Sequence, residues 1–432
     1  MADIRAFRAF RYDLGRVGNL SDVVCPPYDV IDAPLQQALY DRSPYNVVRL
    51  ELNKPQRTDT DATNRYSRAA GFLREWLADD VLKQDSAQSL YVCHQEYTVE
   101  GRQHLRKGFF ARVRLQPFGA GQIYAHEETM AGPKADRLSL LRATGMNLSP
   151  VFGLFPDEHN EVQQALDAAV GRGLPLEATD HLGVVSRLWP VTDQHVISQV
   201  TGLLGPKPVF IADGHHRYET GLRYLQEQRD AHQVPNADAA ANFILMNLVG
   251  MSDPGLLILP THRLVGGLSG MSADKLRTLL GGHFQLETVG RGADGAKEAW
   301  ERIQIEGTQS VLGFGTVADD TWQLARLTRA ATMDELASEH SADWRGLAVS
   351  ILHMLVLNKL IGGETACQYV HQLQEVQDAA GKKACDLAVL VPPATMGHVE
   401  RIAGNLEKMP PKSTYFYPKL LSGLVFNSVK GG

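Results

Sequence analysis

The sequence predicts an α+β fold, equally described as mixed α/β, with a mixed β-sheet at its core. Two observations favour this class. Ser89–Tyr97 and Phe109–Leu115 have the pattern of two strands, the first running towards a turn at Gly101, as in a β-hairpin. Elsewhere a short apolar strand, Pro208–Asp213, leads directly into the helical pattern of His215–Arg229. Antiparallel hairpins and strand–helix units together indicate a sheet of mixed direction.

The remaining elements are predicted from the same two patterns, namely the alternation of apolar and polar residues in strands and the helical spacing of apolar residues. A strand is expected at Asn46–Leu52 and a helix over Thr60–Ala78, and both belong to a mixed N-terminal part. The elements expected after it are a helix at Asp136–Thr144, strands at Val151–Phe155, Asn242–Val249 and Leu256–Leu259, a helix at Ser272–Leu280, a strand at Phe284–Val289, a helix at Asp294–Ile303, two strands around Gly315–Asp320 and a buried helix within Gly346–Gly362.

Length allows two or three domains, since 432 residues exceed one ordinary domain. We expect four parts. Residues 1–120 form an N-terminal α+β part, and residues 121–265 form the core that binds phosphate and substrate. Residues 266–330 form an α+β insertion or small domain, and residues 331–432 form a mostly helical part that packs on the core.

Composition excludes several classes of protein. The 43 Lys and Arg against 49 Asp and Glu give a net charge of −6, so no basic excess favours nucleic acid as a partner. The longest apolar stretch, Gly346–Gly362, is shorter than the ~20 residues that span a bilayer, and no signal peptide is expected. Four Cys without a CxxC pair indicate a reducing, cytoplasmic location and no structural zinc. The oligomeric state is left open, a homodimer included.

The segment around Asp213 carries the strongest chemical signal. An apolar strand ends at Asp213, turns at Gly214 and enters a helix with His215, His216 and Arg217. Backbone N–H groups and the positive end of the helix dipole attract an anion there, and the three basic side chains strengthen this. Asp213 is a candidate Mg²⁺ ligand or proton acceptor. The alternative is that Asp213 caps the helix and the histidines form a solvated first turn.

A second candidate is the loop from His126 to Arg137. Lys134, Arg137 and Arg142 are candidates for a phosphate clamp, and Glu127 is a candidate base or substrate contact. The alternative is a charged surface loop. The segment is not a zinc-protease motif, because position 130 is Met rather than His.

Three further segments carry weaker signals. His262 and Arg263 follow a buried strand, where such a pair is either functional or solvated. Cys25 lies in a turn stiffened by two prolines and is a weak nucleophile candidate. Lys412 and Lys419 flank an aromatic run that either covers a pocket or belongs to the core with lysines at its rim.

The glycine pattern Gly290–Gly295 matches a dinucleotide-binding motif but lacks its context. The preceding strand alternates apolar and polar residues, and the segment after the following helix resembles an antiparallel pair. No NAD or flavin is therefore expected. A phosphate-binding P-loop sequence and a Gly-x-Ser-x-Gly elbow are both absent from the sequence.

Several motifs, in one order, carry a resemblance along the whole chain. They are Val24-Cys-Pro-Pro-Tyr-Asp-Val-Ile31, His126-Glu-Glu-Thr129, Gly132-Pro-Lys-Ala-Asp-Arg-Leu138, Ile211-Ala-Asp-Gly-His-His-Arg-Tyr-Glu-Thr220, Leu259-Pro-Thr-His-Arg263 and Met409-Pro-Pro-Lys-Ser-Thr-Tyr-Phe-Tyr-Pro-Lys419. In these motifs the chain resembles the domain-of-unknown-function 1015 family.

The Asp213-Gly-His-His-Arg217 corner also resembles the phosphate-binding corner of the superfamily that holds ParB partition proteins, sulfiredoxins and free serine kinases. His215 stands where sulfiredoxins carry their Cys, which rules out chemistry by that cysteine. ParB proteins have Gly-Glu-Arg-Arg at the corner and a helix-turn-helix after it, which this sequence lacks. The serine kinases carry an Asp-Gly-His-His-Arg type of corner. This resemblance implies a sheet core of the ParB/sulfiredoxin type.

The resemblance implies a phosphotransferase for a small hydroxyl metabolite, with free L-serine as acceptor and ADP, ATP or pyrophosphate as donor, together with Mg²⁺. The residues implied to bind phosphate are Gly214, His215, Arg217, Lys134 and Arg137. The implied catalytic residues are Asp213, His216 and Glu127, and Asp213 is also the implied Mg²⁺ ligand. The residues implied to bind substrate are His126, His262 and Arg263. Two alternatives remain open: a nucleotide-binding switch of the ParB type without chemistry on a metabolite, and a regulatory or scaffold protein whose corner binds no anion.

Overall fold

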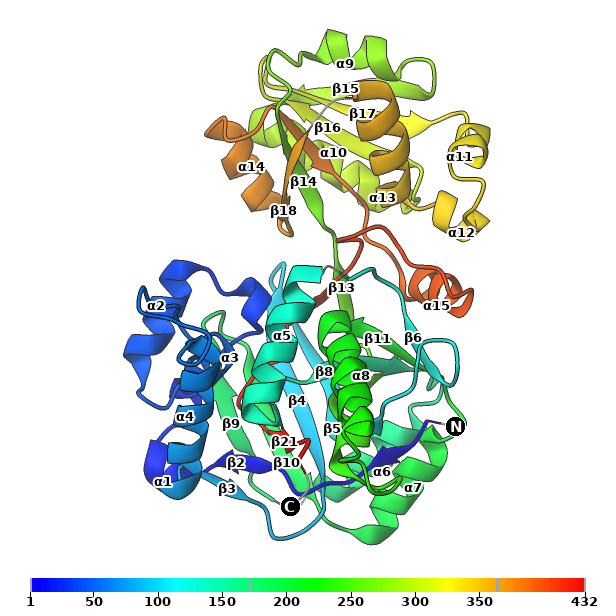
Figure 1. Cartoon of the computed structure of the whole chain (residues 1–432). Helices are drawn as coiled ribbons and strands as arrows, with labels where there is room; N and C mark the ends of the chain where they lie inside the picture. Colours follow the sequence, from blue (N-terminus) through cyan, green and yellow to red (C-terminus); the bar gives the residue numbers. More distant parts are fainter. Residues whose placement is uncertain (1, 130, 171–172, 363–364, 431–432) are drawn as a thin grey trace. The chain divides into compact units, whose positions relative to one another are not determined.

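The computed structural model describes residues 2–129, 131–170, 173–362 and 365–430, and it divides the chain into two compact units (Figure 1). The first unit comprises Met1–Ala125, Thr129–Leu257 and Pro418–Gly432, and the second comprises His126–Glu128 and Ile258–Tyr417. The four-part division stays a prediction. Most of residues 1–120 and most of residues 121–265, which are expected as separate parts, belong to the first unit.

The first unit is built on a nine-stranded mixed sheet. Most neighbouring strands are antiparallel, but β11 runs parallel to β6, and β12 runs parallel to β8. The mixed sheet expected from the sequence is thereby confirmed. Along the sheet the order is β6 (Ile123–Ala125), β11 (Val209–Asp213), β8 (Val151–Phe155), β12 (Phe243–Gly250), β5 (Arg102–Arg114), β4 (Leu90–Val99), β10 (Val185–Val191) and β9 (Leu176–Thr179), with β1 (Ile4–Arg5) also pairing with β5.

Alternation along the hairpin strands places a hydrophobic core on each face of this sheet. Phe109 of β5 packs in one core and its neighbour Phe110 in the other. The helices of the unit are α1 (Leu14–Val17), α2 (Ala33–Arg42), α3 (Val48–Glu51), α4 (Arg65–Ala78), α5 (Ala131–Thr144), α6 (Glu161–Val170), α7 (Gln194–Leu204) and α8 (His215–Asp230). Its short strand pairs are β2 (Phe10–Tyr12) with β3 (Leu82–Gln84) and β7 (Met146–Asn147) with β21 (Asn427–Ser428).

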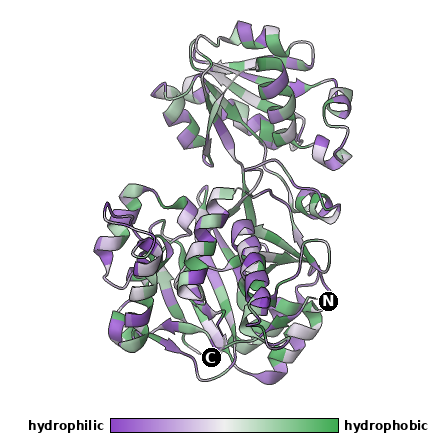
Figure 2. Cartoon of the chain, viewed as in Figure 1, coloured by the Kyte–Doolittle hydropathy of each residue, from purple (hydrophilic) through white to green (hydrophobic). Residues whose placement is uncertain are grey.

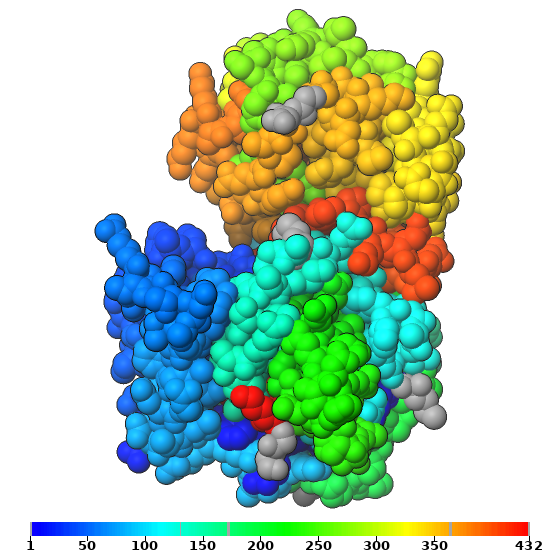
Figure 3. All heavy atoms as spheres, viewed as in Figure 1, coloured from blue at the N-terminus to red at the C-terminus, as the bar shows by residue number. Residues whose placement is uncertain are grey.

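Helices α5 and α8 lie side by side on the first unit, as their cyan and green atoms show in Figure 3. Much of the visible side of α8 is hydrophilic (Figure 2), whereas Tyr218 and Leu225 of the same helix are buried against the sheet. The beginnings of these two helices carry the basic residues that the sequence singles out, so their arrangement determines how those residues meet.

The second unit holds a six-stranded sheet in the order β15 (Phe284–Arg291), β17 (Thr321–Leu327), β16 (Val311–Thr316), β19 (Leu387–Leu390), β14 (His262–Gly266) and β18 (Ala366–Val370), and all of its pairs are antiparallel. The antiparallel pair predicted after the glycine pattern is confirmed. The unit also contains α9 (Ala273–Leu280), α10 (Gly292–Glu306), α11 (Ala331–Leu336), α12 (Ala342–Arg345), α13 (Ala348–Ser350), the irregular wide helix η4 (Ile351–Ile361), α14 (Leu373–Gly381), α15 (Met396–Gly404) and β20 (Tyr415–Tyr417), which pairs with β13 (Leu257–Leu259).

Two local expectations need correction. The strand expected at Asn46–Leu52 is the short helix α3, because the Asn46 side chain accepts the Val48 N–H at 3.0 Å and begins a helical turn. The C-terminal part is rich in helices but also contains strands that the sequence analysis did not identify. One of them, β19, lies inside the six-stranded sheet and joins residues predicted as separate parts.

Within the described residues, no helix is long and apolar enough to cross a membrane. Cys25 is buried, and burial raises the pKa of its thiol well above the usual value. A raised pKa disfavours the nucleophilic thiolate, which weighs against the weak nucleophile candidate.

Candidate functional site

The corner between β11 and α8 has the geometry that the sequence suggests. A register shift in the pairing of β11 with β8 between Ile211 and Asp213 places Asp213 opposite Phe152. Gly214 then adopts φ 89° and ψ 27°, a left-handed conformation that favours glycine. Helix α8 begins at the next residue, His215. The strand end, the turn and the start of a sixteen-residue helix therefore meet at one point.

Asp213 binds two cations at this point. One carboxylate oxygen accepts from Lys419 Nζ at 2.8 Å, and the other accepts from Arg217 Nη2 at 2.6 Å. All three side chains are at most 19% exposed. The carboxylate therefore pairs with side chains rather than acting as the helix cap of the alternative interpretation. With one negative and two positive side chains, and with His215 also acting on Asp213 electrostatically, the corner has a positive balance.

The ion pairs control the ionisation of Asp213. Burial by itself raises the pKa of this carboxyl, but attraction to Lys419 and Arg217 outweighs burial, and the pKa lies well below its usual value. Asp213 is thus a carboxylate at neutral pH. A weakly basic carboxylate accepts a proton less readily, so any anion that draws Lys419 or Arg217 away from Asp213 strengthens it as a base.

Arg217 is held close to the turn. Its Nη1 donates to the carbonyl of Pro150, whereas its buried Nε has no hydrogen-bond partner among the described residues. A Cβ on residue 214 would lie 2.9 Å from that Nε. Gly214 therefore gives the guanidinium access to the turn, and the unpartnered N–H is a donor suited to an anion.

The predicted clamp residues Lys134 and Arg137 lie on α5 but in different settings. Lys134 Nζ binds Glu219 of α8 at 2.9 Å and is 38% exposed. Arg137 is buried, and its guanidinium binds Asp136 through Nε at 2.7 Å and the Glu51 carboxylate through Nη1 at 3.1 Å. A phosphate contact by Arg137 stays a prediction and requires it to leave two carboxylates.

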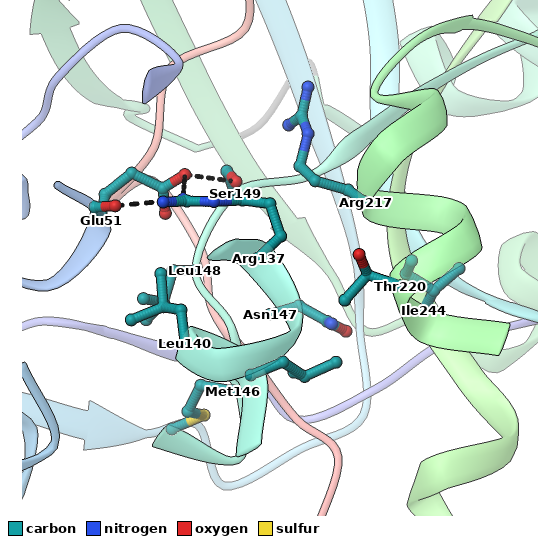
Figure 4. A pocket seen from close by; sticks show the side chains of 11 residues that line it. Glu51, Arg137, Leu140, Met146, Asn147, Leu148, Ser149, Arg217, Thr220 and Ile244 are labelled. Atoms are coloured by element: carbon teal, nitrogen blue, oxygen red, sulfur yellow. Dashed lines mark hydrogen bonds and ion pairs between the residues drawn. The ribbon is translucent and has the colours of Figure 1, made fainter. Parts of the chain in front are cut away.

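A cavity of about 40 Å³ lies beside this network (Figure 4). Glu51 bridges Arg137 and Ser149 on one side of it, and Arg217 extends from α8 on another. Its volume suits a few water molecules rather than a nucleotide. This cavity is therefore not a candidate for nucleotide binding.

The second unit brings together three other predicted residues around Lys412. Glu127 Oε1 accepts from the Lys412 backbone N–H at 2.9 Å, and Arg263 Nη2 donates to the Lys412 carbonyl at 2.9 Å. His126 is buried and its Nε2 lies 2.9 Å from Thr414 Oγ1. The backbone of Lys412 has φ 60°, an uncommon value for a residue with a side chain, and these contacts hold it there.

His262 and Arg263 are buried in the second unit, so the solvated alternative for this pair is wrong. His262 Nδ1 accepts the Val391 N–H at 3.2 Å, and its ring meets Trp300 edge-on. Burial lowers the pKa of His262 to about 3, so the ring is neutral at ordinary pH. Its role in substrate binding stays a prediction.

Lys419 is the residue of the corner that the sequence indicates least clearly. In the sequence it is only one of two lysines beside an aromatic run, yet it lies 206 positions from Asp213 and binds it directly. Arg106, which binds the carbonyl before Lys419, carried no functional signal at all. His216 is half-buried in the first turn of α8, as the sequence indicates.

Together the fold and the corner define a mixed α/β protein in which one buried carboxylate at a helix start is paired with two cations. Residues 4–350 match the model of a family described as "Protein of unknown function (DUF1015)", and the chain belongs to this family. The expected resemblance to that family is thereby confirmed. A comparison with curated proteins finds no match.

Solved structures show distant likeness. A free serine kinase variant in complex with AMP is 10% identical over 68% of this chain and 84% of that chain, with a TM-score of 0.33. SbnI from Staphylococcus aureus with a C-terminal truncation is 12% identical over 73% and 86%, with a TM-score of 0.34. A conserved hypothetical protein from Pyrococcus furiosus is 12% identical over 68% and 87%, with a TM-score of 0.32.

Proposed function

We propose that this protein is a phosphotransferase that moves a phosphoryl group from a nucleotide or pyrophosphate to the hydroxyl of a small metabolite. One observation carries the proposal: Asp213, at the start of α8, is paired with both Lys419 and Arg217. Two cations on one carboxylate leave positive charge at a helix N-terminus, where a phosphate is favoured. Phosphoryl transfer depends mainly on placement and positive charge, which this corner supplies.

In the proposed reaction, the acceptor hydroxyl oxygen forms a bond to the donor's terminal phosphorus while the bond to the bridging oxygen breaks. The donor leaves as the shortened nucleotide, or as phosphate if the donor is pyrophosphate. Gly214, His215 and Arg217 hold donor phosphates, and Lys134 and Lys419 neutralise charge. The hydroxyl proton passes to Asp213, whose basicity rises as the phosphates draw its two cations away. His216 is the other proposed catalytic residue of this corner, while the catalytic role expected for Glu127, which belongs to the second unit, stays a prediction.

Mg²⁺ fits this corner only together with the donor. Within the described ranges, no three His, Cys, Asp or Glu residues gather as a metal site. As an alternative to its role as proton acceptor, Asp213 would hold the ion together with donor oxygens, since Mg²⁺ commonly binds through one carboxylate and substrate phosphates. The ion supplies charge neutralisation on the phosphates.

Free L-serine is the first acceptor to test, because the corner resembles that of the free serine kinases in sequence. The purified protein is incubated with Mg²⁺, one of ATP, ADP or pyrophosphate, and L-serine or a related hydroxy compound, and the products are identified by mass spectrometry. We expect O-phosphoserine that is lost in Asp213→Asn and His216→Ala. Arg223→Ala is the control, because Arg223 lies exposed on the same helix. Transfer that both site variants leave unchanged contradicts the proposal.

A second candidate is a nucleotide-binding module without chemistry. It is favoured by the ion pairs themselves, since a carboxylate that binds two cations is better suited to organise an anion site than to accept a proton. Stabilisation by nucleotide without any product supports this candidate. The absence of both transfer and stabilisation contradicts both functions.

A further inference from the structure

Arg106 on β5 is a buried cation without a counter-ion in contact. Arg106 is only 1% exposed. Its Nη2 donates to the Pro418 carbonyl at 2.6 Å and to Gln95 Oε1, and both of these acceptors are uncharged. Among the described residues, no carboxylate lies within hydrogen-bond distance of this guanidinium, and its buried Nη1 has no partner. A buried charge in such surroundings reduces stability, so its position calls for a functional explanation.

The contacts of Arg106 converge on the peptide that carries Lys419. Pro418, whose carbonyl Arg106 binds, directly precedes Lys419, and Gln95 Nε2 donates to the Lys419 carbonyl at 3.4 Å. Gln95 and Arg106 face each other across β4 and β5, so the hairpin fixes both. The carbonyls before and after the Lys419 Cα are thus held by one pair of side chains.

The same guanidinium lies close to the corner itself. It stacks 4.7 Å from the ring centre of Phe152, the residue opposite Asp213 in the sheet. Burial lowers the pKa of Arg106 to about 10, which leaves it protonated at neutral pH. The planar guanidinium carries several N–H donors in fixed directions, so it can hydrogen-bond to more than one oxygen acceptor in a defined geometry, which a lysine ammonium does less well.

We propose that Arg106 and Gln95 are positioning residues that hold the backbone of Pro418 and Lys419, so that the Lys419 ammonium stays on Asp213. A lysine side chain is flexible and loses rotamer freedom when it is fixed, so a held backbone reduces the further cost of placing its ammonium. The expected effect of these residues on anion affinity rests on the proposed function, because the corner is taken to bind phosphate. Their effect on the position of Lys419 does not depend on that function.

The first test measures the reactivity of Lys419 towards an amine-labelling reagent, read by mass spectrometry on the full chain. We expect Arg106→Met and the milder Gln95→Met to increase the labelling rate of Lys419 about tenfold, because the ammonium leaves Asp213. Arg112→Met is the matched control: Arg112 is a partly buried arginine of the same strand that stacks on Phe243 instead. A Lys419 labelling rate that stays at the wild-type value in folded Gln95→Met and Arg106→Met overturns the proposal.

The second test separates positioning from direct binding. Pyrophosphate affinity is measured by calorimetry for Arg106→Met, Lys419→Met and the double variant. We expect Arg106→Met alone to weaken binding about tenfold and to add nothing to Lys419→Met. Additive losses mean that Arg106 acts independently of Lys419 and overturn the proposal. If the wild-type protein binds neither pyrophosphate nor nucleotide, the proposed function fails, while the labelling test still decides on positioning.

Discussion

The substitution Gly214→Ala tests the corner most directly, because it adds one methyl group to the turn. Gly214 has φ 89°, where a side chain costs about 1–2 kcal/mol. The added Cβ would also lie 2.9–3.0 Å from three atoms of the Arg217 guanidinium. That guanidinium is the end of a flexible side chain, so it moves and weakens its bond to Asp213.

Gly183 provides the matched control. It has φ 79°, lies in the turn before β10, and a Cβ there meets nothing within 4 Å. Gly183→Ala thus carries the backbone strain without the clash, and the effect of alanine on the unfolded chain cancels between the two variants. A hydrogen bond to a charged group contributes about 1.5–3 kcal/mol. Since Arg217 only shifts, we expect Gly214→Ala to lose about 1.5 kcal/mol more than Gly183→Ala.

The free energies of unfolding of both variants are measured in urea. Pyrophosphate affinity is measured alongside, and we expect it to fall in Gly214→Ala alone. Equal destabilisation of the two variants, together with unchanged affinity, would show that Arg217 does not depend on the open turn, and the reasoning about the corner would be wrong.

Three further outcomes are expected. The pKa of Asp213 in the folded protein lies below the unfolded value of about 3.9, so its ion pairs stabilise the fold above that pH, and their contribution is lost as the pH falls through the folded pKa. Asp213→Asn should therefore flatten the acid side of the profile of unfolding free energy against pH. Glu51→Gln should cost about 3 kcal/mol in urea unfolding, since buried Arg137 loses one of two carboxylates, whereas Arg142→Ala at the surface should change stability by about 0.5 kcal/mol or less. His262 should show a neutral imidazole by NMR at pH 5, because its folded pKa is about 3; the unfolded ring takes up a proton below about pH 6.5, so its contribution to stability decreases from there towards pH 3.

The fold was predictable where periodicity was local. The hairpin of β4 and β5 and the step from β11 into α8 needed only alternation, an apolar run and a glycine. The helix α3 was not predictable in this way, since a seven-residue pattern is short and a side-chain contact of Asn46 decided its conformation. Strand β19 was missed because its four buried residues resemble any short apolar segment.

The sequence singles out the residues of the corner but not the partners that they have in the fold. The residue types between Asp213 and Arg217 indicate an anion site without any tertiary information. The sequence alone gives no reason to expect that Lys419 completes it, because that contact joins positions 206 residues apart. Arg137 illustrates the reverse case: a basic residue on a promising loop turns out to be paired with Glu51, a residue from a segment taken for a strand.

The burial of the charges also determines how the corner can respond to a ligand. Asp213, Arg217 and Lys419 are at most 19% exposed, so bulk water competes only weakly with their mutual ion pairs. An anion that binds the unpartnered Nε–H of Arg217 leaves Asp213 its two cations, whereas an anion that takes Arg217 and Lys419 partly from Asp213 makes the carboxylate more basic. Only in the second case are anion binding and the readiness of Asp213 to accept a proton coupled through the same two cations. A nucleotide-binding module would need only the first effect, so the pKa of Asp213 with pyrophosphate bound distinguishes the two proposed functions: a marked rise favours the phosphotransferase, and an unchanged low value favours the module.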